Sequence, residues 1–333
     1  MLHIFIFLYY GCFMQKDNTQ QIQKAIVAGN GPSLTAIDYA RLPLSYEVFR
    51  VNQFYLEDAY YLGKNIRAVT FAHQTLFEHI YTMQVLNNTQ EYKIDSVIIN
   101  DSPFISTSRD EFHVKSNFLL RVLYKHSFID TLYNGRLSEN IGEFLEYDSL
   151  QKLYSNKNPR SGIYLCAIAV ALGYREIYLT GIDFYEGKNY AFNHSKTNIL
   201  KLVPDGFENI TLPQEPQQES YHSKAADLEA LEFLAKTYNV EFYSLSPASP
   251  LSHYIPLAPI TNNTAKPEKK PSNYTNDIIL PPEHAYRTFR ALNEHIDYSK
   301  RGRVKNNFYL KLLYDLARLP RDLKYCFKKP KRF

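Results

Sequence analysis

Short apolar runs alternate with longer amphipathic stretches through the central part of the chain. Runs rich in β-branched and aromatic residues, which predict strands, lie at 24–28, 47–51, 66–71, 94–99, 176–180 and 240–245. Apolar positions recur at helical spacing over 75–86, 161–172 and 223–238, which predicts helices. Strands that alternate with helices favour an α/β fold, with a mostly parallel sheet and helices on both of its faces.

Polar stretches divide the chain into parts. The predicted domain extends from residue 24 to about 260, and the stretch 261–276 that follows it is typical of a linker. An irregular stretch from Lys196 to Ser220 interrupts the domain, and an insert of this length is usually a functional loop.

Residues 1–23 form an apolar leader that is not required by the predicted fold. Its apolar run, MLHIFIFLYYGCFM, is too short to span a bilayer and lacks the basic region and cleavage site of a signal peptide. Two interpretations stay open: an interfacial anchor, or a leader upstream of a start at Met14.

Basic residues are concentrated in the C-terminal tail, 277–333. Twelve Lys and Arg against two Asp lie in residues 300–333, although the net charge of the whole chain is only +4. Apolar residues recur there at helical spacing up to Pro320, at Phe308, Leu312 and Leu316, so we expect a basic amphipathic helix. A terminal basic cluster favours an anionic membrane surface over nucleic acid. A helix docked on its own domain remains the alternative.

The cysteines and the acidic residues exclude some classes of site. Cys12, Cys166 and Cys326 lie far apart and form no C-x-x-C pair, so the sequence contains no disulfide framework or zinc-binding pair and fits a reducing compartment. The chain also has no D-x-D motif, the carboxylate pair that would hold a metal ion on a nucleotide diphosphate.

A glycine-rich turn, GNGPS at Gly29–Ser33, directly follows the first predicted strand. A strand, a glycine turn and the start of a helix form a phosphate-binding unit. The dinucleotide pattern G-x-G-x-x-G would need glycine at Leu34, so a dehydrogenase is disfavoured. The turn either lets backbone N–H groups and the Asn30 amide approach a nucleotide, or is an ordinary turn.

Polar side chains follow two other predicted strands. Asn52 and Gln53 come after the strand at 47–51, and their amides suit a polyhydroxylated, N-acylated sugar, although they could equally cap a turn. The motif GIDFY at Gly181–Tyr185 follows the strand at 176–180, with Tyr190 close behind. Its phenols could donate hydrogen bonds to a departing phosphate, or the acid could cap a turn beside packed tyrosines.

The tripeptide His-Ser-Lys occurs twice, at His194 and at His222, on either side of the irregular stretch. Histidine titrates near neutrality, which suits the role of general base. The tripeptide alone does not decide which copy acts.

Four motifs occur in a fixed order: AGNGPS, the segment around NQFY, SGIYLCAIAVALGYREIYLTGIDFY, and HSK before a helix that contains LEALEFLAKTY. Together they resemble the bacterial lipooligosaccharide sialyltransferases of glycosyltransferase family 42. The resemblance extends from about Lys24 to Pro259 and includes neither the leader nor the basic tail. It implies a single Rossmann-like domain with a small lid, at about 186–221, and inverting, metal-independent transfer from CMP-activated sialic acid.

The resemblance also implies roles for individual residues. Tyr185 and Tyr190 match the two tyrosines that donate to the leaving phosphate, and His222 matches the base that deprotonates the acceptor hydroxyl. His194 falls where the family has no histidine. The expected substrate contacts are Gly29, Asn30, Gly31, Ser33 and Asp183 for the nucleotide, Asn52 and Gln53 for the sugar, and further Gly181, Phe184, Ser161, Arg160 and His73.

The chain departs from the family pattern in two places. Ala72 and His73 stand where the family has an asparagine near the sialic-acid carboxylate, and His73 either replaces that asparagine or is a surface residue. Asn158, Pro159 and Arg160 stand where the family reads Arg-Ile-Thr. The displaced arginine leaves the acceptor contacts open.

We therefore expect a sialyltransferase that uses CMP-N-acetylneuraminic acid, needs no cofactor, and forms an α2,3 linkage to a terminal galactose of lipooligosaccharide. The alternatives are another nucleotide sugar, an added α2,8 activity, or a nucleotide- or membrane-binding protein that has lost activity. The resemblance suggests a homo-oligomer. The tail suggests a cytoplasmic enzyme attached peripherally to the inner membrane, with no nucleic-acid partner.

Overall fold

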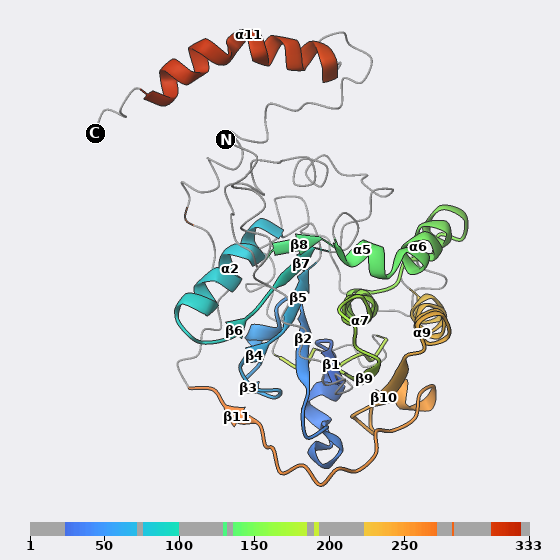
Figure 1. Cartoon of the computed structure of the whole chain (residues 1–333). Helices are drawn as coiled ribbons and strands as arrows, with labels where there is room; N and C mark the ends of the chain where they lie inside the picture. The colour runs from blue at the N-terminus through green and yellow to red at the C-terminus, as the bar shows by residue number, and fades with distance from the viewer. Residues whose placement is uncertain are drawn as a thin grey trace, which may run out of the picture.

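The computed structural model describes residues 24–71, 76–99, 129–131, 136–184, 190–192, 223–271, 282 and 308–327. Its centre is a seven-stranded sheet in the order β10-β9-β1-β2-β5-β7-β8, in which all neighbours are parallel (Figure 1). The strands are β1 (Lys24–Ala28), β2 (Glu47–Val51), β5 (Ala68–Phe71), β7 (Val97–Ile99), β8 (Ile129–Thr131), β9 (Glu176–Thr180) and β10 (Glu241–Ser244). The predicted α/β fold with a parallel sheet is confirmed.

The strands β1, β2 and β9 have the predicted bounds. Each is buried on both faces after its first residue, as is usual in parallel sheets. The buried residues are mainly apolar, although β2 includes the buried Arg50. The runs predicted at 66–71 and 94–99 are each divided in two. Their first residues form the short strands β4 (Asn65–Ile66) and β6 (Lys93–Ile94), which pair with each other outside the main sheet.

Helices cover both faces of the sheet. One face carries α7 (Ser161–Ala171), with α5 (Arg136–Asn140), α6 (Gly142–Tyr154) and α9 (Lys224–Tyr238) beside it (Figure 1). The other face carries α2 (Leu76–Asn88). Alternate residues of β1 divide between the two cores: Ala25 and Val27 face α7, whereas Ile26 and Ala28 face the other layer. The predicted helix at 161–172 is confirmed as α7, and it is buried, because Ile163 to Ala171 are all inaccessible to solvent or nearly so.

The remaining elements are short. The helix expected after the first glycine turn is a short 3-10 helix, η1 (Pro32–Ala36). Three similar 3-10 helices are η2 (Tyr39–Arg41), η3 (Phe54–Leu56) and η5 (Pro250–His253). Pro32 and Pro250 begin two of these turns, where a missing N–H is tolerated.

The sheet has a topological switch point between β1 and β9. From β1 the chain proceeds outward through β2, β5, β7 and β8, and it returns to β9 on the opposite side of β1. At such a point the loops leave the two central strands in opposite directions, and the crevice outside their carboxyl ends is where open α/β sheets bind ligands. The glycine turn after β1 and the GIDFY loop after β9 both begin there.

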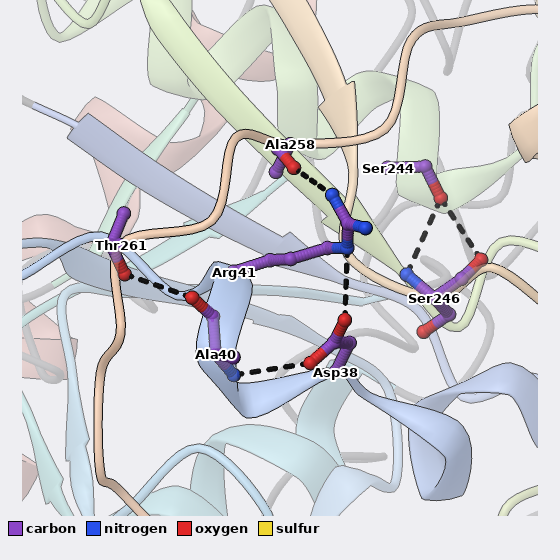
Figure 2. A network of polar contacts seen from close by, with 7 residues as sticks. All are labelled: Asp38, Ala40, Arg41, Ser244, Ser246, Ala258 and Thr261. Atoms are coloured by element: carbon purple, nitrogen blue, oxygen red, sulfur yellow. Dashed lines mark hydrogen bonds and ion pairs between the residues drawn. The ribbon is translucent and has the colours of Figure 1, made fainter.

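The described part of the segment expected to be a linker lies on the domain surface, and we call residues 258–271 the strap. Arg41 donates a hydrogen bond to the Ala258 carbonyl, and the Thr261 hydroxyl donates to the Ala40 carbonyl at 3.1 Å (Figure 2). Further along, β11 (Glu268–Lys269) pairs antiparallel with β3 (Ala59–Tyr60). The strap is therefore held along its length by the domain.

The C-terminal helix α11 spans Phe308–Phe327 and lies apart from the sheet (Figure 1). It continues through Pro320, where the apolar pattern predicted its end, because a proline removes one backbone bond without ending every helix. Among the described residues, no helix is both long and apolar enough to cross a membrane. The leader 1–23 and all of the expected lid 186–221 except residues 190–192 lie outside the described residues.

Candidate active site

The glycine turn after β1 lies directly against the loop after β9. The Gly29 N–H donates to the Thr180 carbonyl at 2.9 Å, and the Gly31 N–H donates to the Gly181 carbonyl at 2.8 Å. A Cβ on Gly29 would lie 2.1 Å from the Gly181 carbonyl oxygen, so a side chain there would collide with backbone. Gly181 has a φ of +64°, a conformation that glycine adopts without strain. The backbones of the two loops are therefore in direct contact, and glycine is required for this approach.

Asp183 joins three loops at this point. Its Oδ2 accepts the Ser33 N–H at 2.8 Å, and its Oδ1 accepts the Ser249 hydroxyl at 2.9 Å. The Ser33 hydroxyl accepts the Gly181 N–H at 3.0 Å, and the Ser246 hydroxyl donates to the Ser33 carbonyl at 2.7 Å. Asp183 and Ser33, both expected at the nucleotide, are buried and hold the glycine turn in shape.

Asn30 lies in the glycine turn with one polar atom unused. Its side-chain Nδ2 donates to the Val51 carbonyl at 3.1 Å, and its backbone carbonyl accepts the Ala191 N–H at 2.8 Å. Its Oδ1 is buried and accepts no hydrogen bond in the structure. A buried acceptor without a donor is unfavourable. A hydroxyl or amino group of a bound ligand would satisfy it.

Of the three expected catalytic residues, Tyr185, Tyr190 and His222, the structure describes Tyr190. Its half-buried ring stacks on Phe192, with 5.4 Å between the ring centroids. Because the next residue, Ala191, is hydrogen-bonded to Asn30, Tyr190 lies beside the glycine turn. The structure thus brings together two features that the sequence places 160 positions apart.

Asn52 and Gln53 form a turn at the carboxyl end of β2. Asn52 has a left-handed backbone, with φ of +48°, and its N–H donates to the Thr70 carbonyl at 2.9 Å. Both side chains are partly exposed. The two amides therefore lie at the same edge of the sheet as the glycine turn, on the adjacent strand.

Two buried basic side chains, Arg50 and Lys270, contact the residues on either side of the amide turn. Arg50, the penultimate residue of β2, forms an ion pair with Glu57, and both side chains are almost fully buried. Lys270 of the strap donates from Nζ to the Tyr55 carbonyl at 2.8 Å. Burial lowers the pKa of Lys270 to about 7 and that of Arg50 to about 10.

Lys224, the lysine of the second His-Ser-Lys, contacts the loop after β9. Its Nζ lies 5.4 Å from the ring centroid of Phe184 and 4.7 Å from that of Tyr254, both within cation–π range. Lys224 begins α9, so the start of this helix lies beside the GIDFY loop. His222 itself lies outside the described residues.

Arg160 and Ser161 form the start of α7, and Arg160 contacts α9. The Arg160 N–H donates to Asp227 Oδ1 at 2.8 Å, and its Nη1 lies 2.6 Å from Asp227 Oδ2. Asp227 is fully buried, and burial raises the pKa of its carboxyl although Arg160 opposes this shift. Arg160, expected as a substrate contact, is therefore engaged by a carboxylate of the protein itself.

Several expected residues lie outside the described part of the chain: His73, Tyr185, His194 and His222. Among the described residues, no group of three or more His, Cys, Asp or Glu could hold a metal ion. Sequence reasoning missed Ser246, Ser249, Lys224 and Asp227. Two of them have a local signal: Ser249 precedes Pro250, which is typical of a helix cap, and Lys224 belongs to the second His-Ser-Lys.

The chain is similar to known proteins in both sequence and fold. Residues 23–330 match the family model described as Alpha-2,3-sialyltransferase (CST-I). An uncharacterized protein of Haemophilus influenzae is 37% identical over 254 residues, which cover 75% of this chain and 99% of that protein.

Solved structures of sialyltransferases from Campylobacter jejuni are also similar. The monofunctional alpha-2,3-sialyltransferase Cst-I has a TM-score of 0.69 and 38% identity, over 83% of this chain and 97% of that one. CstII in complex with the substrate analogue CMP-3FNeuAc has a TM-score of 0.65 and 39% identity, over 80% of this chain and 98% of that one.

Proposed function

Because the chain belongs to the CST-I alpha-2,3-sialyltransferase family and is a sialyltransferase, we propose that it transfers N-acetylneuraminic acid from CMP-N-acetylneuraminic acid to a terminal galactose of lipooligosaccharide. The proposed product carries an α2,3 linkage. An oligosaccharide acceptor is supported by a structure of CST-II in complex with a trisaccharide acceptor and CMP, which is 39% identical to this chain.

The observation that carries the donor assignment is the unsatisfied Oδ1 of Asn30 at the switch point. It lies in the glycine turn at the carboxyl end of β1, the position at which open α/β sheets bind ligands. We assign Gly29, Asn30 and Gly31 to direct contact with CMP. Asp183 and Ser33 act there by holding the turn in shape.

The neighbouring amide turn fits the sugar. Asn52 and Gln53 present donors and acceptors on the strand next to β1, where the sialic-acid part of the donor would extend from the nucleotide. We propose that Ser161 and His73 bind the same sugar. We propose that Gly181 and Phe184, in the loop after β9, contact the substrate from the side opposite the amide turn. Lys224 lies over the Phe184 ring.

We propose a single displacement with inversion at the anomeric carbon. The acceptor hydroxyl oxygen attacks that carbon on the face opposite CMP, the bond from the carbon to the phosphate oxygen breaks, and the hydroxyl proton moves to His222. Tyr185 and Tyr190 donate hydrogen bonds to the phosphate as it gains negative charge. CMP is already a good leaving group, so two neutral phenols are sufficient, and we propose that no metal ion or cofactor takes part.

The two His-Ser-Lys copies provide the test of this mechanism. His222→Ala should abolish transfer from CMP-N-acetylneuraminic acid, because the acceptor then lacks its base, whereas His194→Ala should keep most of it. Initial rates of transfer to lactose measure the difference, and an unchanged affinity for CMP shows that each variant is folded. Equal losses in the two variants would mean that the base is assigned wrongly.

We further propose that the enzyme works in the cytoplasm as a homo-oligomer on the inner membrane surface. On α11 the apolar side chains Tyr309, Leu312, Leu313, Leu316 and Leu319 are 48% to 73% exposed, and basic residues dominate the flanking sequence. Such a helix suits an anionic membrane surface.

The proposed homo-oligomer is supported by a different surface. Three apolar residues on α6 are exposed, Leu150, Leu153 and Tyr154, and such a patch suits contact with a second copy of the chain.

A further inference from the structure

We infer that Ser249 is a positioning residue for donor binding. Its hydroxyl orients the Asp183 carboxylate, and that carboxylate supports the glycine turn. The inference rests on the proposed function, because it takes the glycine turn as the part of the site that contacts CMP. Ser249 lies 66 positions after Asp183, in the segment that follows β10, and it is almost fully buried.

Each oxygen of the Asp183 carboxylate accepts one hydrogen bond from a different loop. Oδ1 accepts the Ser249 hydroxyl at 2.9 Å, and Oδ2 accepts the Ser33 N–H at 2.8 Å. Hydrogen bonds to a carboxylate are stronger than those between neutral groups, so two of them together fix the plane of the carboxylate. Without the Ser249 hydroxyl, the bond to Ser33 alone would have to orient it.

The orientation of this carboxylate matters because it packs directly against the glycine turn. A Cβ on Gly31 would lie only 2.4 Å from Asp183 Oδ2, so no space separates the carboxylate from the Gly31 backbone. Rotation of the carboxylate would therefore shift both Gly31 and Ser33. The bond from the Gly31 N–H to the Gly181 carbonyl would remain, so we expect a displaced turn and not an unfolded one.

Ser249 itself is held in place independently of Asp183. Its N–H donates to the Ser246 carbonyl at 2.9 Å, and the Ser244 hydroxyl of β10 donates to the same carbonyl at 3.2 Å (Figure 2). The Ser246 hydroxyl donates to the Ser33 carbonyl at 2.7 Å and lies 3.0 Å from the hydroxyl of Thr180, the last residue of β9. The ends of β9 and β10 therefore determine where the Ser249 hydroxyl lies.

The residue after Asp183 has a backbone conformation that needs support. Phe184 has a φ of +52°, in the left-handed region that residues with side chains rarely adopt, and such a conformation persists only where the surroundings hold it. The Phe184 ring packs edge-on against Tyr254 at the end of η5, with 6.3 Å between the ring centroids. Ser249 caps the start of η5, so this short helix contacts the β9 loop at both Asp183 and Phe184.

The chain offers a matched control within the same short helix. The Ser249 hydroxyl oxygen also accepts the Leu251 N–H at 3.3 Å, so Ser249→Ala removes the cap of η5 together with the bond to Asp183. The Ser252 hydroxyl supports the same helix by donating to the Ser249 carbonyl at 2.7 Å and to the Pro247 carbonyl at 3.1 Å. Ser252→Ala therefore weakens η5 and keeps the hydroxyl that faces Asp183. Ser249→Thr keeps both the hydroxyl and the cap.

The test compares these three variants with Asp183→Ala and with the double variant Asp183→Ala/Ser249→Ala, all in the full chain. Calorimetry gives the Kd for CMP. Initial rates give kcat and the KM values for CMP-N-acetylneuraminic acid and for lactose. A melting curve of each protein shows that it is folded at the assay temperature.

We expect Ser249→Ala to raise the Kd for CMP and the KM for the donor by about 10-fold, because the hydrogen bond that it removes ends on a charged group. The kcat and the KM for lactose should stay close to wild type, since the turn contacts the nucleotide equally before and during the reaction. Ser249→Thr and Ser252→Ala should keep the wild-type Kd. In the Asp183→Ala background, Ser249→Ala should add no further loss, because Ser249 acts through the carboxylate.

A wild-type Kd in Ser249→Ala would overturn the inference, whatever its melting temperature, and so would an equal rise in Ser252→Ala. A further loss of affinity in the double variant would also overturn it. If Asp183→Ala does not fold, the comparison of Ser249→Ala with Ser249→Thr and Ser252→Ala decides. Failure of the folded wild-type protein to bind CMP would overturn the proposed function itself, and this inference with it.

Discussion

His79, near the start of α2, is fully buried, and neither of its ring nitrogens has a hydrogen-bond partner among the described residues. Its ring stacks on Phe71, the last residue of β5, with 4.4 Å between the ring centroids. Burial disfavours the imidazolium ion and lowers the pKa of His79 to about 3. An imidazole in an unfolded chain titrates near about 6.5. Between these two values the unfolded chain binds a proton that the folded protein does not bind.

The free energy of unfolding should therefore fall as the pH drops from about 6.5 toward 4, because protonation favours the unfolded state across this range. His79→Leu should remove this part of the pH dependence and leave stability at pH 7 unchanged or higher, since it removes two unpaired buried nitrogens. Urea denaturation curves at several pH values measure the effect. The exposed His253, changed to Gln, is the control and should follow the wild type. Parallel curves for His79→Leu and the wild type would contradict this account.

Among individual residues, the sequence indicates position better than role. Gly29, Gly31 and Gly181 could be placed at strand ends, and their close approach in the structure explains why they are glycine. The partners of Asp183 and Arg160 could not be predicted, because Ser249 and Asp227 are 66 and 67 positions away in the chain. A carboxylate after a strand is visible in a sequence, but the hydroxyl or guanidinium group that it contacts across the fold is not.

At the scale of elements, burial decides what could be predicted. The strands β1, β2 and β9 and the helix α7 are buried and mainly apolar, so their bounds follow closely from composition. The edge strand β8 has only three residues. The helix α6 has apolar residues on its exposed side as well, namely Leu150, Leu153 and Tyr154. Such elements depend on tertiary packing more than on local pattern.

The strap is an element whose burial the sequence pattern does not predict. Its composition, rich in Asn, Lys and Pro, is typical of a linker, yet Lys270 is buried and Thr261 is bonded to the domain. The Lys270 stem and ammonium lie close to the rings of Tyr60 and Tyr92, at 5.0 Å and 5.2 Å from Nζ to the centroids. Aromatic rings distant in sequence stabilise a cation that hydropathy alone would place in solvent. The strap is therefore bonded to η3, which directly follows the amide turn.

At the scale of the whole molecule, the parallel topology brings the candidate site together. The glycine turn, the amide turn, the β9 loop and the starts of α7 and α9 come from five separate parts of the chain. They meet because all seven strands point the same way, so that their following loops share one edge of the sheet. The order of motifs in the sequence could predict this gathering. The distances within it needed the structure.

The tail is predicted to attach the enzyme to membranes without taking part in transfer. Removal of residues 277–333 should leave transfer to lactose close to wild type, because the described site residues all lie within 24–271. The same truncation should reduce sedimentation with vesicles that contain anionic lipid, since it removes the basic cluster and the exposed apolar face of α11.

Vesicles of neutral lipid are the control for the contribution of charge. Weak binding of the full chain to neutral vesicles and stronger binding to anionic ones is the expected pattern. Equal binding of full and truncated chains to anionic vesicles would contradict the membrane role, and a loss of transfer to lactose would show that the tail belongs to the catalytic unit.

The central claim is that this chain transfers sialic acid from CMP. Its most direct test incubates the purified full-length protein with CMP-N-acetylneuraminic acid and lactose in the presence of EDTA, with UDP- and GDP-sugars in parallel, and identifies the product by mass and linkage analysis. The account predicts sialyllactose with an α2,3 linkage from the CMP donor only, at a rate that EDTA does not change. Transfer from another nucleotide sugar, dependence on an added metal ion, or no sialylated product would contradict it.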